Sequence, residues 1–442
     1  MTEPDRALDF IAIGLGPFNL SLACLMEPLT EHQGLFLEKS SEFNWHPGML
    51  MPDATLQNPF LADLVTLADP TSRFSYLNYC KQHGKIFSYF IREKFYLTRR
   101  EYNDYCRWAA TQLKSVRFGS EVTDITYDAP STLYCVRGVV GEARRPFAYW
   151  ARRLVLGIGS KPYVPPCCAQ VEGLVHTAHY LAHKQRLQGL RSITVLGSGQ
   201  SAAEVYHDLL KEREQYGYAL HWITRSPRIF AMDTTKFVLE LLCPDYIEHF
   251  CALADAKKEP IAREHRSVYA GINVQLINAI YELLHEQRAS SGAVGHILSN
   301  AELRACKKHR AGYALEFFHR EQELPFEHHC EGLVLGTGYV QQPPSFIDSI
   351  GQRIRWDTQG RYEQSRNYSV DVDGEAIFVQ NAGMHSHGFT GPDLSLACHR
   401  NAQLIHALTG IEYYALDYGT AMQDFGPPAA WLASVNATAI PL

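Results

Sequence analysis

Short, unbroken apolar runs recur along the chain. Runs without alternation are typical of parallel strands buried on both faces, so they predict an α/β fold. Several are followed at once by glycines that would turn the chain toward a helix. The runs are Phe10–Ile13, Leu35–Leu37, Leu154–Leu156, Ile193–Leu196, Leu333–Leu335 and Ile377–Val379.

Other stretches carry different periodicities. Residues 116–158 alternate between apolar and polar side chains, which predicts antiparallel strands. Residues 100–113 show a helical period with one apolar stripe, which favours core packing over a cofactor contact. Residues 231–291 are also predicted to be helical. The stripe consists of Tyr102, Tyr105, Cys106 and Ala109.

The first apolar run opens a nucleotide-binding pattern. Gly14, Gly16 and Pro17 form a turn before a predicted helix, whose positive end can face a diphosphate. The next run ends in Glu38, where a carboxylate can accept both hydroxyls of an adenosine ribose. Asn19 replaces the usual third glycine, so we expect a side chain between helix and strand.

A second pattern of the same kind begins at Ser192. It contains Gly197, Gly199, Gln200 and Ser201, and Ala202 stands where the third glycine would be. The strand that follows ends in Arg225 rather than in an acid, with Arg228 nearby, which suits the 2′-phosphate of NADPH. The alternative is that both arginines belong to a solvated loop edge.

Each of the two patterns forms a glycine turn that can receive a diphosphate, which we call a cradle. Two cradles predict two Rossmann-like domains, each for one dinucleotide. We assign residues 1–170 and 331–442 to a discontinuous FAD-binding domain. Residues 171–230 and 292–330 form the NADPH-binding domain, and residues 231–291 form a helical region that caps the substrate site.

Composition favours small-molecule partners. The 442 residues carry a net charge of -6, which offers no electrostatic footprint for nucleic acid or anionic lipid. No signal peptide or membrane span is expected, so we predict a cytoplasmic protein. The 11 cysteines are scattered without a Cys-x-x-Cys spacing, so neither a disulfide framework nor a metal site is indicated.

Taken together, the motifs resemble those of the flavin-dependent N-hydroxylating monooxygenases of hydroxamate siderophore biosynthesis, which include lysine and ornithine N-monooxygenases. They occur in order from end to end of the chain. The stretches that carry the resemblance are Gly14–Leu20, Trp45–Met49, Phe60–Leu64, Asp69–Ser72, Gly197–Ala202, Gly336–Tyr339 and Asn381–Gly388.

The resemblance implies that NADPH reduces FAD, that O₂ adds at flavin C4a, and that one oxygen atom passes to a neutral primary amine. By matching position, Trp45, His46 and Gln57 border the flavin, and Gly338 and Tyr339 also contact a cofactor. A homo-oligomer, either a dimer or a tetramer, is implied as well.

His385 and His387 lie in the last matching stretch. A pair of histidines can suggest a metal site or a general base, but their loop position favours a structural or flavin-adjacent role.

The expected substrate follows from what the chain lacks. Relatives that use lysine or ornithine hold the substrate's carboxylate with a lysine and an asparagine, at positions occupied here by Ala62 and Leu239. Burying an unpaired carboxylate is costly, so we predict a diamine, putrescine or cadaverine. Asp63 or Asp393 could hold the distal ammonium.

Several alternatives remain open at this point. Arg73 or Lys236 could restore a carboxylate clamp for lysine or ornithine, and histamine is another candidate amine. A disulfide reductase shares the two-cradle layout but would need a redox cysteine pair in the first domain. A flavin-binding scaffold, a Baeyer–Villiger enzyme and a sulfide oxygenase are the other candidates.

Overall fold

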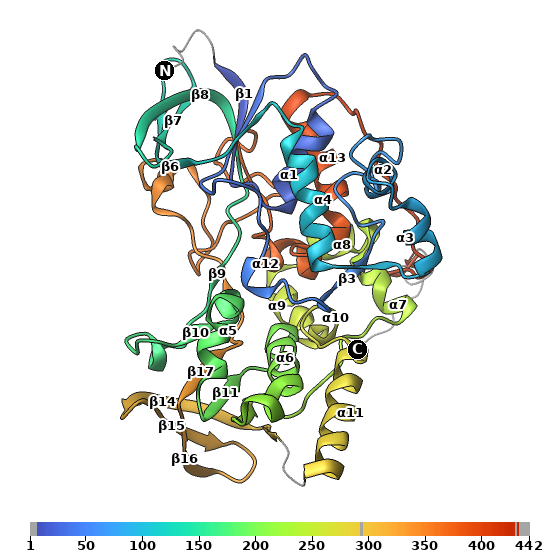
Figure 1. Cartoon of the computed structure of the whole chain (residues 1–442). Coiled ribbons are helices and arrows are strands. Elements are labelled where there is room, and N and C mark those ends of the chain that lie inside the picture. The colour runs from blue at the N-terminus through green and yellow to red at the C-terminus, as the bar shows by residue number, and fades with distance from the viewer. Residues whose placement is uncertain (1–6, 292–294, 429–430, 433–442) are drawn as a thin grey trace, which may run out of the picture.

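The computed structural model describes residues 7–291, 295–428 and 431–432. Two sheets with their helices lie one above the other, as Figure 1 shows, and the cap helices lie beside the junction. Mixed α/β architecture with two Rossmann-like units is therefore confirmed.

The first sheet has the strand order β5-β2-β1-β8-β7-β6, and β19 also pairs with β8. Strand β8 is long: its first half pairs antiparallel with β7 and its second half pairs parallel with β1 and β19. The C-terminal part of the chain thus completes the first sheet, as predicted. The strands are β1 (Leu8–Ile13), β2 (Gly34–Leu37), β5 (Val116–Arg117), β6 (Ser120–Asp128), β7 (Leu133–Val140), β8 (Arg145–Leu156) and β19 (Ile377–Val379).

Strand β5 differs from the expectation. The alternating pattern predicts an antiparallel strand at Val116–Phe118, but β5 pairs parallel with β2. Only β6, β7 and the first half of β8 are antiparallel. A two-residue strand carries too short a pattern for its direction to be read from alternation.

The two faces of the first sheet are buried by different layers. Phe10 and Ala12 join the core beneath α1 (Pro17–Met26), α4 (Arg99–Thr111) and α13 (Ala397–Thr409). The alternate residues of the same strand, Ile11 and Ile13, pack toward β6, β7 and the 3₁₀ segment Ser345–Arg353. All four residues of the predicted α4 stripe are buried.

The second sheet is fully parallel, in the order β10-β17-β11-β12-β13. Its helix layer contains α5 (Tyr180–Gln188) and α6 (Gln200–Tyr216), and the antiparallel sheet β14-β15-β16 covers its other face. The strands are β10 (Val175–His176), β11 (Ser192–Leu196), β12 (Ala219–Ile223), β13 (His296–Leu298), β14 (Ala301–His309), β15 (Gly312–His319), β16 (Leu324–Cys330) and β17 (Gly332–Leu335).

Two of the predicted boundaries need correction. The division after residue 330 assigns β17 to the first domain, but β17 pairs with β11 in the second sheet. The predicted cap, 231–291, is also too long, because α11 (Val274–Ser291) packs against α6 through Ile280 in the second core. Apolar runs show that a strand or helix exists, whereas its partners are decided by long-range packing.

The remaining elements lie around the junction of the two sheets. The cap helices pack around Phe389, which follows β19 in the chain. The short pairs β3-β4 and β9-β18 link the larger units. These elements are β3 (Thr55–Pro59), α2 (Tyr76–Gln82), α3 (Ile86–Arg92), β4 (Tyr96–Thr98), β9 (Lys161–Pro162), α7 (Lys236–Leu239), α8 (Pro244–Ala252), α9 (Asp255–Glu264), α10 (Arg266–Tyr269), β18 (Tyr339–Val340) and α12 (Met384–His387).

Among the helices of the described residues, no stretch is both long and apolar enough to cross a membrane.

A buried cluster of amide side chains joins the two ends of the chain. Gln380, directly after β19, donates to Oδ1 of Asn19 at 3.0 Å and to Oδ1 of Asn401 at 2.9 Å. Asn401 on α13 donates to the Phe18 carbonyl and to Ser21 Oγ, both at 2.9 Å. Because these groups are shielded from water, each depends on the others for its hydrogen bonds.

We expect Asn401→Ala to lower the free energy of unfolding by about 2 to 4 kcal/mol, because it removes three buried hydrogen bonds and leaves partners unpaired. The urea transition followed by circular dichroism measures this loss. Gln403→Ala, which changes a half-buried amide on the same helix, is the matched control and should cost about 0.5 kcal/mol or less. Equal losses in the two variants would contradict the role given to the cluster.

Candidate active site

The first cradle has the geometry that a diphosphate requires. Gly14 has φ +85°, and a Cβ there would lie 2.6 Å from the carbonyl oxygen of Gly157. Gly16, by contrast, faces open space, and no side chain caps the first turn of α1, which begins at Pro17. The backbone N–H groups of that turn are therefore available to an anion.

Asn19 explains how the cradle manages without its third glycine. Its Nδ2 donates to the Gly14 carbonyl at 2.7 Å, so the side chain lies between helix and strand as expected. Room for the Asn19 side chain is made at Gly157, directly after β8, because a Cβ there would lie 2.3 Å from Asn19 Nδ2.

Glu38 lies at the end of β2 with its carboxylate held toward the cradle. One oxygen accepts the N–H of Leu15 at 2.7 Å and the other accepts the N–H of Ser40 at 2.8 Å. The carboxylate is thus oriented by the glycine turn itself, and its remaining lone pairs can accept ribose hydroxyls.

The Trp45-His46-Pro47 loop is packed between the two sheets. His46 adopts φ 49°, and its ring lies 4.6 Å from Trp45 and 5.9 Å from Tyr339, measured between centroids. Burial, with a smaller contribution from the charge of Arg99, lowers the pKa of His46 to about 4. The imidazole is therefore neutral at pH 7.

Tyr339 reaches the same cluster from the other cradle. It follows Gly338, which has φ +85° and whose carbonyl lies 3.0 Å from His176 Nε2. The predicted residues at 45–46 and 338–339 are therefore brought together, although they are far apart in the sequence.

Gln57 on β3 presents an unsatisfied polar group. Its Nε2 is buried, and no described residue accepts a hydrogen bond from it. Buried amide donors are almost always satisfied, so this atom marks a place where a ligand acceptor fits. Together with the open turn at Gly16 and the oriented Glu38, it shows that these residues suit FAD.

The second cradle repeats the geometry of the first. Gly197 has φ +132°, and a Cβ there would lie 2.0 Å from the Gly336 carbonyl oxygen, whereas Gly199 faces open space. No side chain caps α6, so its first-turn N–H groups, including that of Ser201, can face a phosphate. Ala202 stands at the position of the third glycine and allows α6 to pack closely on the sheet, since its small side chain lies against Gly336.

Gln200 is engaged within the protein. Its Nε2 donates to Glu204 Oε1 at 2.8 Å, and its Oε1 accepts the Asn273 N–H at 2.8 Å. Its side chain therefore ties α6 to the start of α11, and only its backbone N–H faces the cradle. Arg225 is exposed and has no hydrogen bond or ion pair among the described residues.

One ion pair between the sheets was not predicted. Arg99, at the start of α4, lies 2.6 Å from Glu204 on α6, and both side chains are largely buried. Nothing in the local sequence signals this contact, since the two residues are 105 positions apart and belong to different units.

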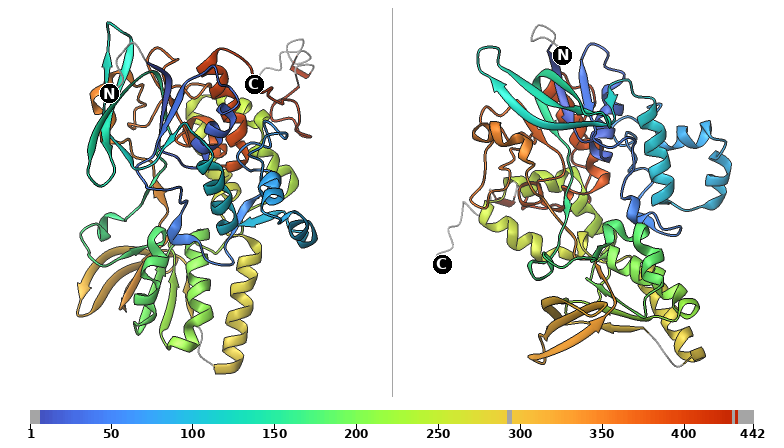
Figure 2. Two further views of the ribbon diagram at one scale, coloured as in Figure 1. Left: turned by 45° about the horizontal axis from the view of Figure 1, so that its top comes forward. Right: turned by 60° about the vertical axis from the view of Figure 1, so that its left-hand side comes forward.

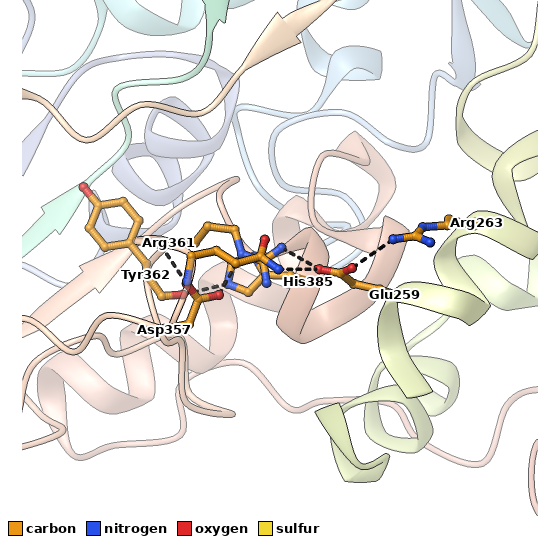
Figure 3. A network of polar contacts seen from close by, with 7 residues as sticks. Glu259, Arg263, Asp357, Arg361, Tyr362 and His385 are labelled. Atoms are coloured by element: carbon orange, nitrogen blue, oxygen red, sulfur yellow. Dashed lines mark hydrogen bonds and ion pairs between the residues drawn. The ribbon is translucent and has the colours of Figure 1, made fainter. Parts of the chain in front are cut away.

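The two predicted histidines near residue 386 have structural partners. His385 Nε2 lies 2.7 Å from the Tyr362 carbonyl, beside the Arg361, Glu259 and Arg263 network that joins α9 to the 357–362 loop (Figure 3). His387 stacks on Tyr368 at 4.4 Å, and burial lowers its pKa to about 3. No group of three metal-ligating side chains occurs in the described residues.

The predicted substrate residues do not all face one place. Ala62 is buried just after β3, and Leu239 is half-buried at the end of α7. Asp63 is not available to an ammonium: its two oxygens accept the N–H groups of Val65, Thr66 and Tyr76 and the Thr66 hydroxyl. Its assignment as a substrate residue is therefore wrong, because four donors already satisfy it.

Asp393 is partly free. Its Oδ1 accepts the Asn58 Nδ2 at 2.7 Å and both the N–H and the hydroxyl of Ser395. No described residue donates to its Oδ2. Asn58 is next to Gln57 on β3, so Asp393 is held beside the strand that carries the unsatisfied amide. No local pattern signals the Asn58 contact, which spans 335 positions.

Comparison with known proteins places this geometry in a family. The model of the L-lysine 6-monooxygenase/L-ornithine 5-monooxygenase family matches residues 6–341. The chain is 50% identical to the alcaligin biosynthesis enzyme of Bordetella pertussis, over 95% of this chain and 92% of that protein. It is 44% identical to the putrescine N-hydroxylase of Shewanella oneidensis, over 96% of this chain and 86% of that protein.

A solved structure agrees with these relatives. The FAD-bound cadaverine monooxygenase DfoA of Erwinia amylovora superposes with a TM-score of 0.93 at 45% identity, covering 96% of this chain and 99% of that one. The disulfide reductase and scaffold alternatives are thereby excluded. The chain belongs to the L-lysine 6-monooxygenase/L-ornithine 5-monooxygenase family and is an FAD- and NADPH-dependent N-monooxygenase.

Proposed function

We propose that this enzyme hydroxylates one nitrogen of a short aliphatic diamine that lacks a carboxylate, for hydroxamate siderophore biosynthesis. The observation that carries the proposal is the free Oδ2 of Asp393, a carboxylate whose other oxygen is held by Asn58 on β3. The names of the relatives that act on putrescine and cadaverine support the same class of substrate.

The side chains at positions 62 and 239 offer a carboxylate no partner. Ala62 is 5% exposed and Leu239 is apolar, so neither position supplies a cation. Arg73 pairs with Glu27 at 2.6 Å, and the exposed side chain of Lys236 makes no hydrogen bond or ion pair with another described residue. Holding an amino acid here would therefore leave its carboxylate unpaired, at a cost of several kcal/mol.

A diamine needs an acceptor for its ammonium and not a cation for a carboxylate. Its reacting nitrogen must be neutral, while its distal nitrogen stays an ammonium that needs an acceptor. Asp393 Oδ2 offers a charge-assisted hydrogen bond, and Asn58 holds the carboxylate in place through Oδ1. Asn58 therefore acts as a positioning residue.

FAD, when bound and reduced by NADPH, supplies the activated oxygen. The chain's own residues orient and shelter the reaction. The Gly16 turn would hold the cofactor's diphosphate and Glu38 its adenosine, and Gln57 Nε2 would be available to donate to it. The packed Trp45 and His46 rings exclude water and stay uncharged, which favours a neutral amine over an ammonium at the reacting end.

NADPH belongs in the second cradle, with its diphosphate at the Gly199 turn. Arg225 follows β12, where an NAD-binding domain would carry an acid, and its guanidinium is free to pair a 2′-phosphate. We further propose that the enzyme works in the cytoplasm as a homo-oligomer, with the first unit binding FAD and the second binding NADPH.

The substrate class is tested with a panel of putrescine, cadaverine, histamine, ornithine and lysine. We expect a diamine to give the highest kcat/KM for hydroxylamine product, because its distal ammonium satisfies Asp393 without adding a carboxylate. Product must be scored rather than NADPH oxidation, since uncoupled peroxide release also consumes NADPH. An amino acid at the top of the ranking would refute the proposal.

Asp393→Asn should lower kcat/KM for putrescine about 10- to 100-fold, the loss expected when a hydrogen bond to a charged group is removed. Butylamine is the matched substrate control, because it lacks the distal ammonium and should be affected little. Asparagine keeps the acceptor for Ser395, so the local turn is retained. Equal losses with both amines would show that Asp393 does not read the distal nitrogen.

Arg225→Ala should raise KM for NADPH about tenfold or more and leave KM for NADH nearly unchanged, because only NADPH carries the 2′-phosphate. Stopped-flow reduction of the bound flavin measures both cofactors directly. Arg152→Ala, which removes another exposed arginine from the first sheet, is the control. If Arg225→Ala weakens both cofactors alike, the arginine does not select NADPH.

A further inference from the structure

The hairpin of α2 and α3 carries an apolar surface that the other described residues leave uncovered. We propose that this surface, formed by Leu77, Phe87, Phe90, Ile91 and Phe95 and called here the α3 face, is where a second copy of this chain docks. Figures 1 and 2 show α2 and α3 projecting from the edge of the FAD-binding unit. The proposal names the contact surface of the homo-oligomer proposed above and does not depend on the substrate.

The side chains of the α3 face are unusually exposed for large apolar residues. Phe87 is 76% exposed, Phe90 and Ile91 are each 73% exposed, and Phe95 is 61% exposed. With roughly 200 Å² per large side chain, these four residues present about 500 Å² of apolar surface. A patch of that size lies at the upper end of what monomeric proteins expose and marks an interaction site.

Helix α3 itself points to a missing partner. It has seven residues, and none of them is buried. Phe87, Phe90 and Ile91 are spaced at i, i+3 and i+4, so they form one apolar stripe on the outer side of the helix. So short a helix depends on tertiary packing of its apolar face, which a neighbouring molecule would supply.

The shape and charge of the region suit a second copy. A groove of about 510 Å³ runs beside the stripe, lined by Phe60, Leu77, Phe87, Phe90 and Phe95 among others. A two-fold axis would place the stripe of each copy against the groove of the other. Both signs of charge border the groove, Lys94 and Glu93, so the rim is self-complementary.

The area is also sufficient. Two α3 faces would bury about 1,000 Å² of apolar surface before the rim is counted, which is the lower bound for a specific protein interface. An anionic lipid surface would favour a rim of basic residues alone, whereas Glu93 is exposed here and Arg92 is paired with Glu101.

The test is sedimentation velocity on the FAD-loaded enzyme over a range of concentrations. We expect the wild type to associate, and Phe87→Glu combined with Phe90→Glu to raise the dissociation constant of the contact at least about 100-fold, because two buried aromatic anchors are lost. Tyr281→Glu, which changes a 69% exposed aromatic on α11, is the matched control and should leave association unchanged. Hydroxylamine formation, assayed separately, reports on the proposed reaction and not on this surface.

A monomeric wild type would overturn the proposal, as would an unchanged dissociation constant in the double variant. If the variant loses its flavin absorbance, the proposal is tested by cross-linking a mixture of ¹⁴N- and ¹⁵N-labelled wild type. Links between copies at Lys85 or Lys94 support the proposal, and their absence overturns it. Binding of a monomeric wild type to phosphatidylglycerol vesicles, lost in the variant, would assign the α3 face to lipid instead.

Discussion

The site depends on one buried set of hydrogen bonds, the amide cluster of Asn19, Gln380 and Asn401. It connects the helix that follows the first glycine turn to the last strand of the sheet and to α13. Donors shielded from water need acceptors within the protein, so the bonds of this cluster favour the observed arrangement of the three segments. Because Asn19 also binds the Gly14 carbonyl, the cluster sets the position of the turn that receives the diphosphate.

The second requirement is that the two cradles face each other. The packed contacts between the units are the Arg99–Glu204 ion pair, the rings of His46 and Tyr339, and the close approach of Gly48 to the Ala178 carbonyl. A side chain at Gly48 would lie 2.0 Å from that oxygen, so the aromatic loop can be this near the second unit only with glycine there. The loop that we propose to border the flavin is thus positioned by its contact with the second unit.

Whether a carboxylate near β3 keeps a free oxygen depends on hydrogen-bond donors that are distant in the chain. Asp63 and Asp393 are both carboxylates near the same strand, but four internal donors satisfy the first and leave it no role in binding. Asp393 keeps one oxygen free because Asn58 and Ser395 share the other. In the proposed function, this count of donors distinguishes the structural carboxylate from the one that would bind the substrate.

The sequence by itself determined the two glycine turns, the acid after β2, the stripe of α4 and the completion of the first sheet by the C-terminal part. These follow from local patterns: apolar runs, glycine where φ is positive, and helical periodicity. Only the tertiary structure decided that β17 belongs to the second sheet, that α11 packs on α6, and that Asn58 holds Asp393. Each of these is a contact between residues far apart in the chain, and its partner is chosen by packing and donor satisfaction, which no local pattern records.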